Sequence, residues 1–109
     1  MDKILEAFRP YIDADPDLDI VWSSKLGYIC VDNSGYDLWC KLATDRVELL
    51  TVISSWFFDR AETDMWSDTA DEAMSAMDPI LTQLPDEDRV AVETIMGLYR
   101  KFEEELDNL

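Results

Sequence analysis

Residues 20–42 read IVWSSKLGYICVDNSGYDLWCKL, and this stretch decides the class of fold. It contains three short runs rich in β-branched and aromatic residues, which are typical of strands: 20–23, 28–32 and 36–42. The two breaks between the runs carry the Ser, Gly and Asn residues that hairpin loops favour: 24–27 and 33–35. The stretch therefore predicts a three-stranded antiparallel meander.

The period of two in the third run also predicts a register, because successive side chains of a strand point to opposite faces. We expect Val31 to pair with Leu38, which places one apolar set on a single face: Ile29, Val31, Leu38, Cys40 and Leu42. Cys30 then lies opposite Trp39 on the other face. The thiols of Cys30 and Cys40 would point to opposite sides of the sheet, which is incompatible with a disulfide.

Cys30 and Cys40 are both interpreted as structural, since a buried free Cys usually packs as a small hydrophobic residue. Trp39 has two interpretations. It can lie beneath a neighbouring helix, or it can anchor a partner, as Trp often does at interfaces. We expect the first arrangement.

Helical patterns flank the meander on both sides. Asp2 can cap a short first helix with one apolar face, and Pro10 is expected to weaken or end that helix. A second helix, from Arg46 to about Glu62, is apolar around most of its circumference. Such a helix is expected to be buried on several sides.

Two further helical segments are expected after about Ser67. In the first, Asp78 and Pro79 predict a kink or break. The last helix, from about Asp86 to Asp107, is expected to turn six side chains inward: Val92, Ile95, Leu98, Tyr99, Phe102 and Leu106. The predicted fold is a single α+β domain over residues 1–109, in the order α-β-β-β-α-α-α, with the meander packed on a helical layer.

Charge is the strongest functional signal. The 109 residues carry 25 acidic and nine basic side chains, a formal net charge of −16, and no Lys or Arg occurs from Ala61 to Asp88. A field of this sign repels nucleic acid and anionic membranes and attracts basic protein surfaces. We therefore expect a basic, nucleic-acid-binding protein as the partner, with no direct contact to nucleic acid or membrane.

Carboxylates four residues apart on a helix lie about 6 Å apart, a spacing similar to that of neighbouring phosphates along a nucleic-acid strand. Such a row could satisfy the Lys and Arg side chains of a nucleic-acid channel. The predicted partner-binding residues are Asp64, Asp68, Asp71, Glu72, Asp78, Asp86, Glu87 and Asp88. The alternative is a solvated face that serves only solubility. Partner binding is favoured because solvated faces normally interleave Lys or Arg at helical spacing.

The sequence gives little support for catalysis or for a cofactor or metal site. The chain has no His and three Gly, so His-based catalysis, His-containing zinc sites and a Gly-rich phosphate loop are not expected. We expect neither an enzyme nor a cofactor. Residues 13–19 resemble the opening of an EF-hand calcium loop, but Leu18 replaces the Gly and Ser24 replaces the bidentate Glu, so no metal is expected. The N-terminus has no long apolar run and there are only two Cys, which favours a cytoplasmic protein.

A short acidic chain with one helix, a three-stranded meander and trailing helices resembles small nucleic-acid-mimic inhibitors of phages and mobile elements, among them certain type II-A anti-CRISPR proteins. The resemblance covers the element order over about residues 1–65 and the composition of the whole chain. It implies a non-enzymatic inhibitor that occupies the basic surface of a target such as a nuclease effector. Anti-restriction proteins and the immunity proteins of nuclease toxins follow the same electrostatic logic. No motif accompanies the resemblance, so no functional residue is transferred.

The alternative function is a small structural or adaptor subunit, expected to be a homodimer. Its contacts would use the apolar central helix or the sheet face that carries Trp39. The negative charge would then serve only solubility.

Overall fold

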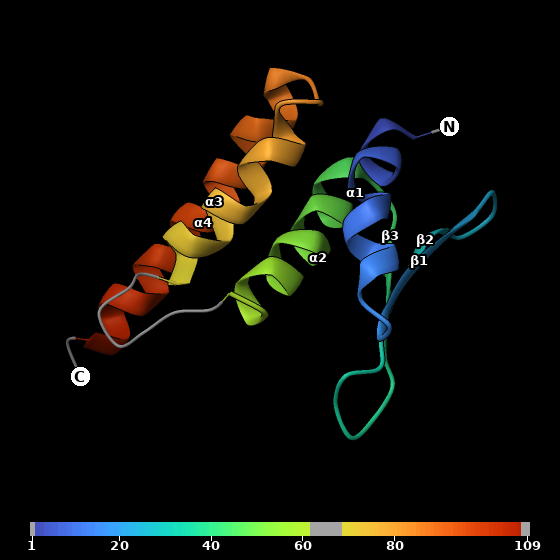
Figure 1. Cartoon of the computed structure of the whole chain (residues 1–109), viewed down its shortest axis with the longest axis horizontal. Helices are drawn as coiled ribbons and strands as arrows, with labels where there is room; N and C mark the ends of the chain where they lie inside the picture. Colours follow the sequence, from blue (N-terminus) through green and yellow to red (C-terminus); the bar gives the residue numbers. More distant parts are fainter. Residues whose placement is uncertain (1, 62–68, 108–109) are drawn as a thin grey trace. The chain divides into compact units, whose positions relative to one another are not determined.

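The computed structural model describes residues 2–61 and 69–107. Within these residues the chain forms four helices and three strands (Figure 1) in the order α1 (Lys3–Ala14), β1 (Leu18–Ser23), β2 (Gly27–Asp32), β3 (Trp39–Ala43), α2 (Arg46–Asp59), α3 (Thr69–Leu81) and α4 (Asp86–Asp107). The predicted α+β class and element order are confirmed. The chain forms two compact units, residues 1–52 and 53–109, and the boundary between them falls within α2.

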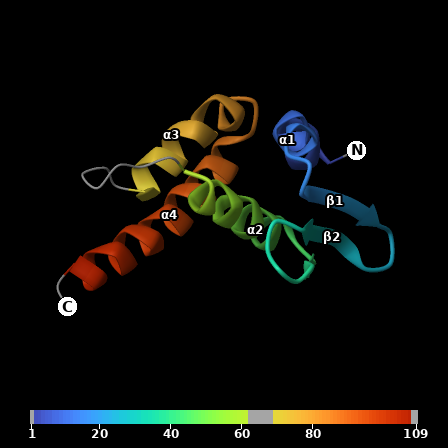
Figure 2. The same ribbon diagram turned by 60° about the horizontal axis from the view of Figure 1, so that its bottom comes forward.

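The three strands form one antiparallel sheet in the order β1-β2-β3, and Figure 2 shows β1 and β2 joined by their hairpin turn. The predicted pairing of Val31 with Leu38 is wrong, because Val31 pairs with Cys40 and Ile29 pairs with Leu42. The difference arises because β3 begins at Trp39, so Leu38 belongs to the connection before the strand. A shift of two residues keeps every side chain on its predicted face.

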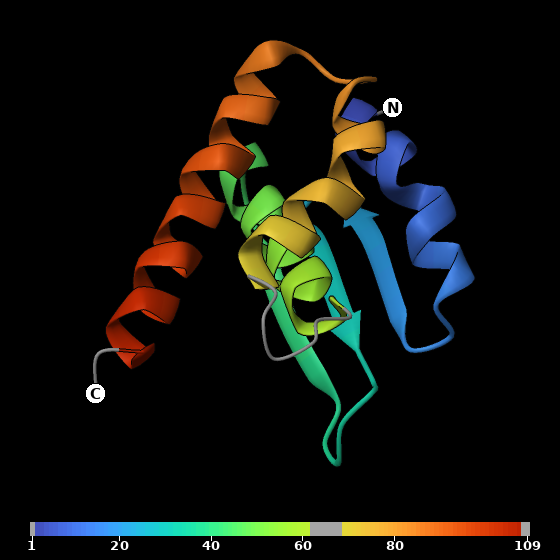
Figure 3. The same cartoon turned by 60° about the vertical axis from the view of Figure 1, so that its left-hand side comes forward.

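Only one face of the sheet is covered. Its buried side chains are Leu18, Ile20, Tyr28, Cys30 and Ala43. α1 contacts β1, in agreement with the views of Figures 1 and 3. Cys30 lies on this face and Cys40 on the other, and both are free thiols, as expected. Cys40 is exposed, so the expectation that both Cys are buried is wrong for this residue. Trp39 is 41% exposed, so the expected helical cover over its side chain is also wrong.

α1 begins where the sequence predicts, but it continues past Pro10. The Oδ1 atom of Asp2 accepts hydrogen bonds from the backbone N–H groups of Ile4 (2.8 Å) and Leu5 (3.4 Å), which is an N-cap. Pro10 lies inside the helix on its exposed side, so the carbonyl four residues earlier is accessible to water. Ile12, one turn from the end of α1, is completely buried and holds that last turn in place.

Substitution of Pro10 by Ala should stabilise the protein. The new N–H can donate to the carbonyl of Glu6, and the clash of the proline ring with that carbonyl disappears, so the free energy of unfolding should rise by up to about 3 kcal/mol. Urea unfolding followed by circular dichroism measures the change. Pro16→Ala, in the turn after α1, is the control and should give no gain. A Pro10→Ala protein no more stable than the parent would show that α1 ends before this residue.

α2 is capped and then buried. The N–H of Glu48 donates to Oδ1 of Asp45 (2.8 Å), while Oε2 of Glu48 accepts from the backbone N–H of Thr44 (2.6 Å). The reciprocal bonds resemble a capping box shifted by one residue. The apolar side chains that follow are buried on several sides of the helix, which confirms the prediction for this element: Leu49, Leu50, Val52, Ile53, Trp56 and Phe57.

α3 and α4 pack against each other as an antiparallel pair (Figure 3). Of the predicted kink or break at Asp78 and Pro79, the break is wrong, because α3 continues through Pro79 to Leu81, a buried residue that anchors its last turn. The inward set of α4 is correct for Val92 but wrong for three residues, which are 51–67% exposed: Leu98, Phe102 and Leu106. The buried stripe of α4 runs through Val92 and Met96 instead, and Leu98 lies about 200° around the helix from Met96.

Candidate functional site

Two of the predicted partner-binding carboxylates hold α3 to α4. Nε of Arg100 donates to Oδ1 of Asp71 (2.7 Å), and Arg89 pairs with Asp78 (2.5 Å). The two arginines lie on α4 and the two acids on α3, so the pairs fix the antiparallel register of the helices. Both acids are more than half exposed, so each pair contributes only about 0–1 kcal/mol. Their carboxylates are nevertheless already engaged within the chain.

Asp88 is not a surface residue. It lies in the first turn of α4, its side chain is 3% exposed, and its backbone N–H donates to the carbonyl of Pro85 (3.0 Å). A carboxylate near a helix N-terminus interacts favourably with the helix dipole, which gives Asp88 a structural role. Two further predicted residues, Asp64 and Asp68, lie outside the described residues.

The remaining three predicted residues are exposed, but they do not form one row. Asp86 and Glu87 lie in the first turn of α4. Glu72 lies in the first turn of α3, next to Asp71, which binds Arg100. The interval from Glu87 to Arg100 corresponds to about 20 Å along α4. The structure therefore brings Asp86 and Glu87 together and places Glu72 several turns away.

The predicted partner-binding residues include two acids of a more regular set on α4, Asp86 and Glu87, but omit the other three. Five exposed carboxylates, which we call the α4 acidic face, lie on the side away from the buried stripe: Asp86, Glu87, Glu93, Glu104 and Glu105. The exposed Lys101 lies among them. Residues seven or eleven apart on a helix point within about 20° of the same direction. Asp86, Glu93 and Glu104 have these separations and are therefore aligned. Assigning Val92 and Met96 as the buried side of α4 would have revealed this face, because the buried side determines which residues of the helix face solvent.

The α4 acidic face is open and partly apolar. Val90 and Leu98 are 58% and 67% exposed between the acids. A Cβ atom built at Gly97 would meet no other atom within 4 Å, so the surface is also uncovered at this residue. From Asp86 to Glu105 the face extends about 30 Å. It thus combines negative charge with apolar contact area over a length suited to a protein partner.

Ion pairs within the chain cannot neutralise the acidic excess. Even if each of the nine Lys and Arg residues paired with a different carboxylate, sixteen carboxylates would remain without a basic partner. Arg100 and Arg89 account for two of these acids, Asp71 and Asp78. The bulk of the negative charge therefore faces solvent.

A second exposed surface lies on the uncovered face of the sheet. Val21 pairs with Ile29, which pairs with Leu42, so three apolar side chains form one row across all three strands. Val21 and Leu42 are 49% and 45% exposed, and Val31 and Cys40 lie beside this row on the same face. The solvated face of an antiparallel sheet is normally polar, and an exposed apolar patch indicates an interaction surface. We call these five residues the apolar sheet face.

The two thiols offer a direct test of which sheet face is covered. Burial raises the pKa of the Cys30 thiol to about 11, with a further rise from Cys40, while Lys41 acts in the opposite direction. The reactive form of Cys is the thiolate. At about pH 8, iodoacetamide should therefore label one thiol of the folded protein rapidly and both thiols of the unfolded protein.

Cys40→Ser should abolish the rapid labelling, and Cys30→Ala should leave it unchanged. Mass spectrometry after timed quenching counts the labelled thiols. Equal labelling rates for the two cysteines of the folded protein would contradict the assignment of the covered face.

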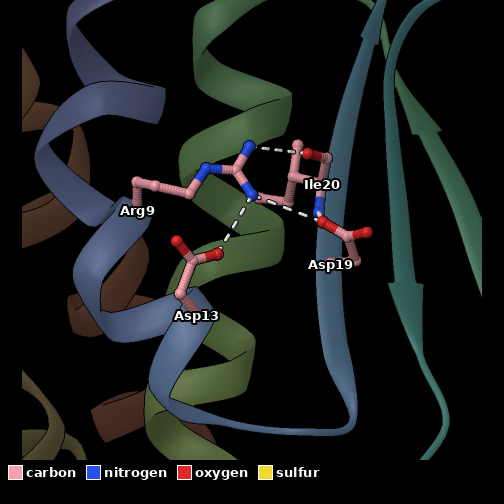
Figure 4. Close-up of polar contacts among 4 residues, drawn as sticks. All are labelled: Arg9, Asp13, Asp19 and Ile20. Carbon is pink, nitrogen blue, oxygen red and sulfur yellow. Dashed lines mark hydrogen bonds and ion pairs between the residues drawn. The ribbon is translucent and has the colours of Figure 1, made fainter.

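Two acids within residues 13–19, at the end of α1 and the start of β1, are already paired with a cation on α1 (Figure 4). The guanidinium of Arg9 lies between Asp13 (3.5 Å) and Asp19 (3.3 Å) and donates to the carbonyl of Ile20 (2.8 Å). Oδ1 of Asp15 accepts from the N–H of Asp17. This segment therefore ties α1 to β1. In the described part of the chain, no three His, Cys, Asp or Glu side chains come close enough together to hold a metal ion.

No helix among the described residues is long and apolar enough to cross a membrane. No family model, curated protein or solved structure matches the chain. Inference about function therefore depends on the chain's own geometry and charge.

Proposed function

We propose that this protein is a non-enzymatic inhibitor that occupies the basic, nucleic-acid-binding surface of a target protein. The observation that carries the proposal is the excess of sixteen carboxylates over basic residues, which internal ion pairs cannot neutralise. Such an excess costs stability through self-repulsion, so a binding role gives it a physical purpose. The target would be a nuclease effector or a similar enzyme of the kind blocked by anti-CRISPR, anti-restriction or immunity proteins.

The α4 acidic face is the surface best suited to this role. Its acids are exposed and spread along about 30 Å of one rigid helix, whereas Asp71, Asp78 and Asp88 are engaged or buried within the chain. A basic groove that binds nucleic acid presents Lys and Arg over a comparable length. Association should be fast and sensitive to salt, because charges are screened beyond about 8 Å at physiological ionic strength.

Charge reversal on α4 tests this surface. Glu93→Lys combined with Glu104→Lys should weaken binding to the target about tenfold or more, since each change replaces an attraction by a repulsion. The matched control combines Glu6→Lys with Asp37→Lys, two exposed acids of the unit formed by residues 1–52, and alters the net charge by the same amount. The control should bind within about threefold of the parent.

Surface plasmon resonance on the captured target measures both affinities, and circular dichroism verifies that both variants are folded. Equal losses in the two variants would mean that only the net charge matters. Full binding by the α4 variant would contradict the assignment of the contact surface.

A second candidate function, a homodimeric adaptor, is favoured by the apolar sheet face. The row formed by Val21, Ile29 and Leu42 could pack against the same row of a second copy. α2 is less suited to this role, because most of its apolar side chains are buried and Val47 is the exposed one among those described.

Light scattering separates the two candidates. The adaptor would be a dimer at both about 0.1 M and 0.5 M salt, because an apolar interface is not weakened by screening. Leu42→Glu should then convert it to a monomer, while Val47→Glu, at an exposed apolar position on α2, should not. A parent protein that is monomeric at all accessible concentrations would exclude the adaptor.

A further inference from the structure

A pocket of about 380 Å³ lies in the unit formed by residues 1–52, where the start of α1 meets the hairpin of β1 and β2. Asp2, Leu5, Trp22 and Tyr28 line it. The volume is within the range of small-ligand pockets, about 300–1,000 Å³. Leu5 and Tyr28 are almost fully buried, whereas Trp22 is 57% exposed. The pocket thus has a packed floor and one aromatic wall that reaches solvent.

The two aromatic rings of the pocket are in contact and inclined to each other. Trp22 and Tyr28 are cross-strand partners, with ring centroids 4.9 Å apart and an angle of 53° between the ring planes. The faces of aromatic rings carry negative electrostatic potential and attract cations within about 6 Å of the centroid. A group entering the pocket can therefore approach the exposed ring of Trp22, which Tyr28 supports from behind.

The carboxylate of Asp2 has acceptor capacity to spare. A carboxylate offers about four acceptor positions. Oδ1 of Asp2 receives the N–H groups of Ile4 and Leu5, and Oδ2 receives the hydroxyl of Tyr28. Counting the donors among the described residues, one position on Oδ2 is left for an incoming donor. The cap bonds and the Tyr28 bond also fix the carboxylate in place, so it needs no reorganisation when a ligand arrives.

The charge balance of the pocket favours a cation over an anion. The N-terminus of α1 contributes about half a positive charge, and the full negative charge of Asp2 outweighs it. No Lys or Arg is among the described residues that line the pocket, and the net charge of −16 adds to the negative potential. A neutral apolar ligand would leave the remaining acceptor position on Asp2 without a donor.

We propose that this pocket binds an organic cation, namely a primary ammonium or guanidinium group such as those of Lys and Arg side chains. The head group would donate to Oδ2 of Asp2 and lie against the ring of Trp22, and the aliphatic stem would contact Leu5. The basic partner proposed above would present such side chains, but the ligand class follows from the pocket alone.

Titration with small probes tests the proposal without a protein partner. The probes are the amides of Nα-acetyl-lysine and Nα-acetyl-arginine, and the neutral control is the amide of Nα-acetyl-norleucine, which has the same stem as lysine without the ammonium group. Binding is followed by the shift of the Trp22 indole N–H signal in ¹H–¹⁵N spectra, which Trp22→Leu identifies. The cationic probes should bind with dissociation constants of about 1 mM, at least about tenfold more tightly than the norleucine amide.

Two variants separate the charge of the pocket from its shape. Asp2→Asn removes the charge but retains a good N-cap residue, and it should weaken binding about tenfold or more. The matched control is Asp45→Asn, which makes the same change at the cap of α2 and should leave binding unchanged. Trp22→Leu, for which binding is followed through the backbone N–H signals of Leu5 and Tyr28, should weaken binding about fivefold.

Several results would overturn the proposal. One is equal binding of the lysine and norleucine amides, and another is an Asp2→Asn protein that binds the cations as well as the parent does. Shifts confined to signals outside the pocket would overturn it too. None of these results depends on the α4 acidic face, so failure here is distinguishable from failure of the proposed function.

Discussion

A shortage of cations decides which acids of this chain are paired and which face solvent. The chain has nine basic and 25 acidic residues, and three of its arginines join two elements of the fold. Arg9 links α1 to β1, and Arg89 and Arg100 link α4 to α3. The acids that pair with these arginines have a structural role, as do the acids that cap α1 and α2 and the buried Asp88. Exposed acids elsewhere on the chain are the ones that a partner can reach.

The shortage of cations also explains why two of the predicted partner-binding acids are paired within the chain. The interval without Lys or Arg ends at Asp88, and the pairing arginines lie just beyond it, at 89 and 100. Periodicity shows which residues share a helix face, but it does not show which side chain of a later helix lies against them. Asp71 and Asp78 therefore look unpaired in the sequence although they are paired in the structure.

Local signals, by contrast, were reliable. The cap at Asp2 and the paired cap of Asp45 and Glu48 depend on neighbours within three residues, and both are present. The prolines show the limit of such signals. Pro10 and Pro79 should end helices by local rules, but buried side chains beyond them, Ile12 and Leu81, keep the helices intact. Tertiary burial outweighed a local penalty of about 3 kcal/mol.

The sheet and the pocket both depend on contacts between elements, which the alternation of side chains along a strand does not reveal. The period of two assigned every side chain of β2 and β3 to the correct face, but the covered face is the one that contacts α1, which no strand pattern encodes. The pocket likewise joins Asp2 to Tyr28, residues 26 apart in the chain. Its aromatic and carboxylate groups could be recognised as a site only once the fold had brought them together.

The most direct test of the central claim, that the exposed carboxylates bind in place of nucleic acid, is affinity capture from a host lysate treated with nuclease. The protein serves as bait at about 0.1 M and 0.5 M salt, captured proteins are identified by mass spectrometry, and DNA is added as a competitor. The account predicts one nucleic-acid-binding protein that is retained at low salt, lost at high salt and displaced by DNA. A partner that resists high salt and ignores DNA, or recovery of the bait alone, would contradict it.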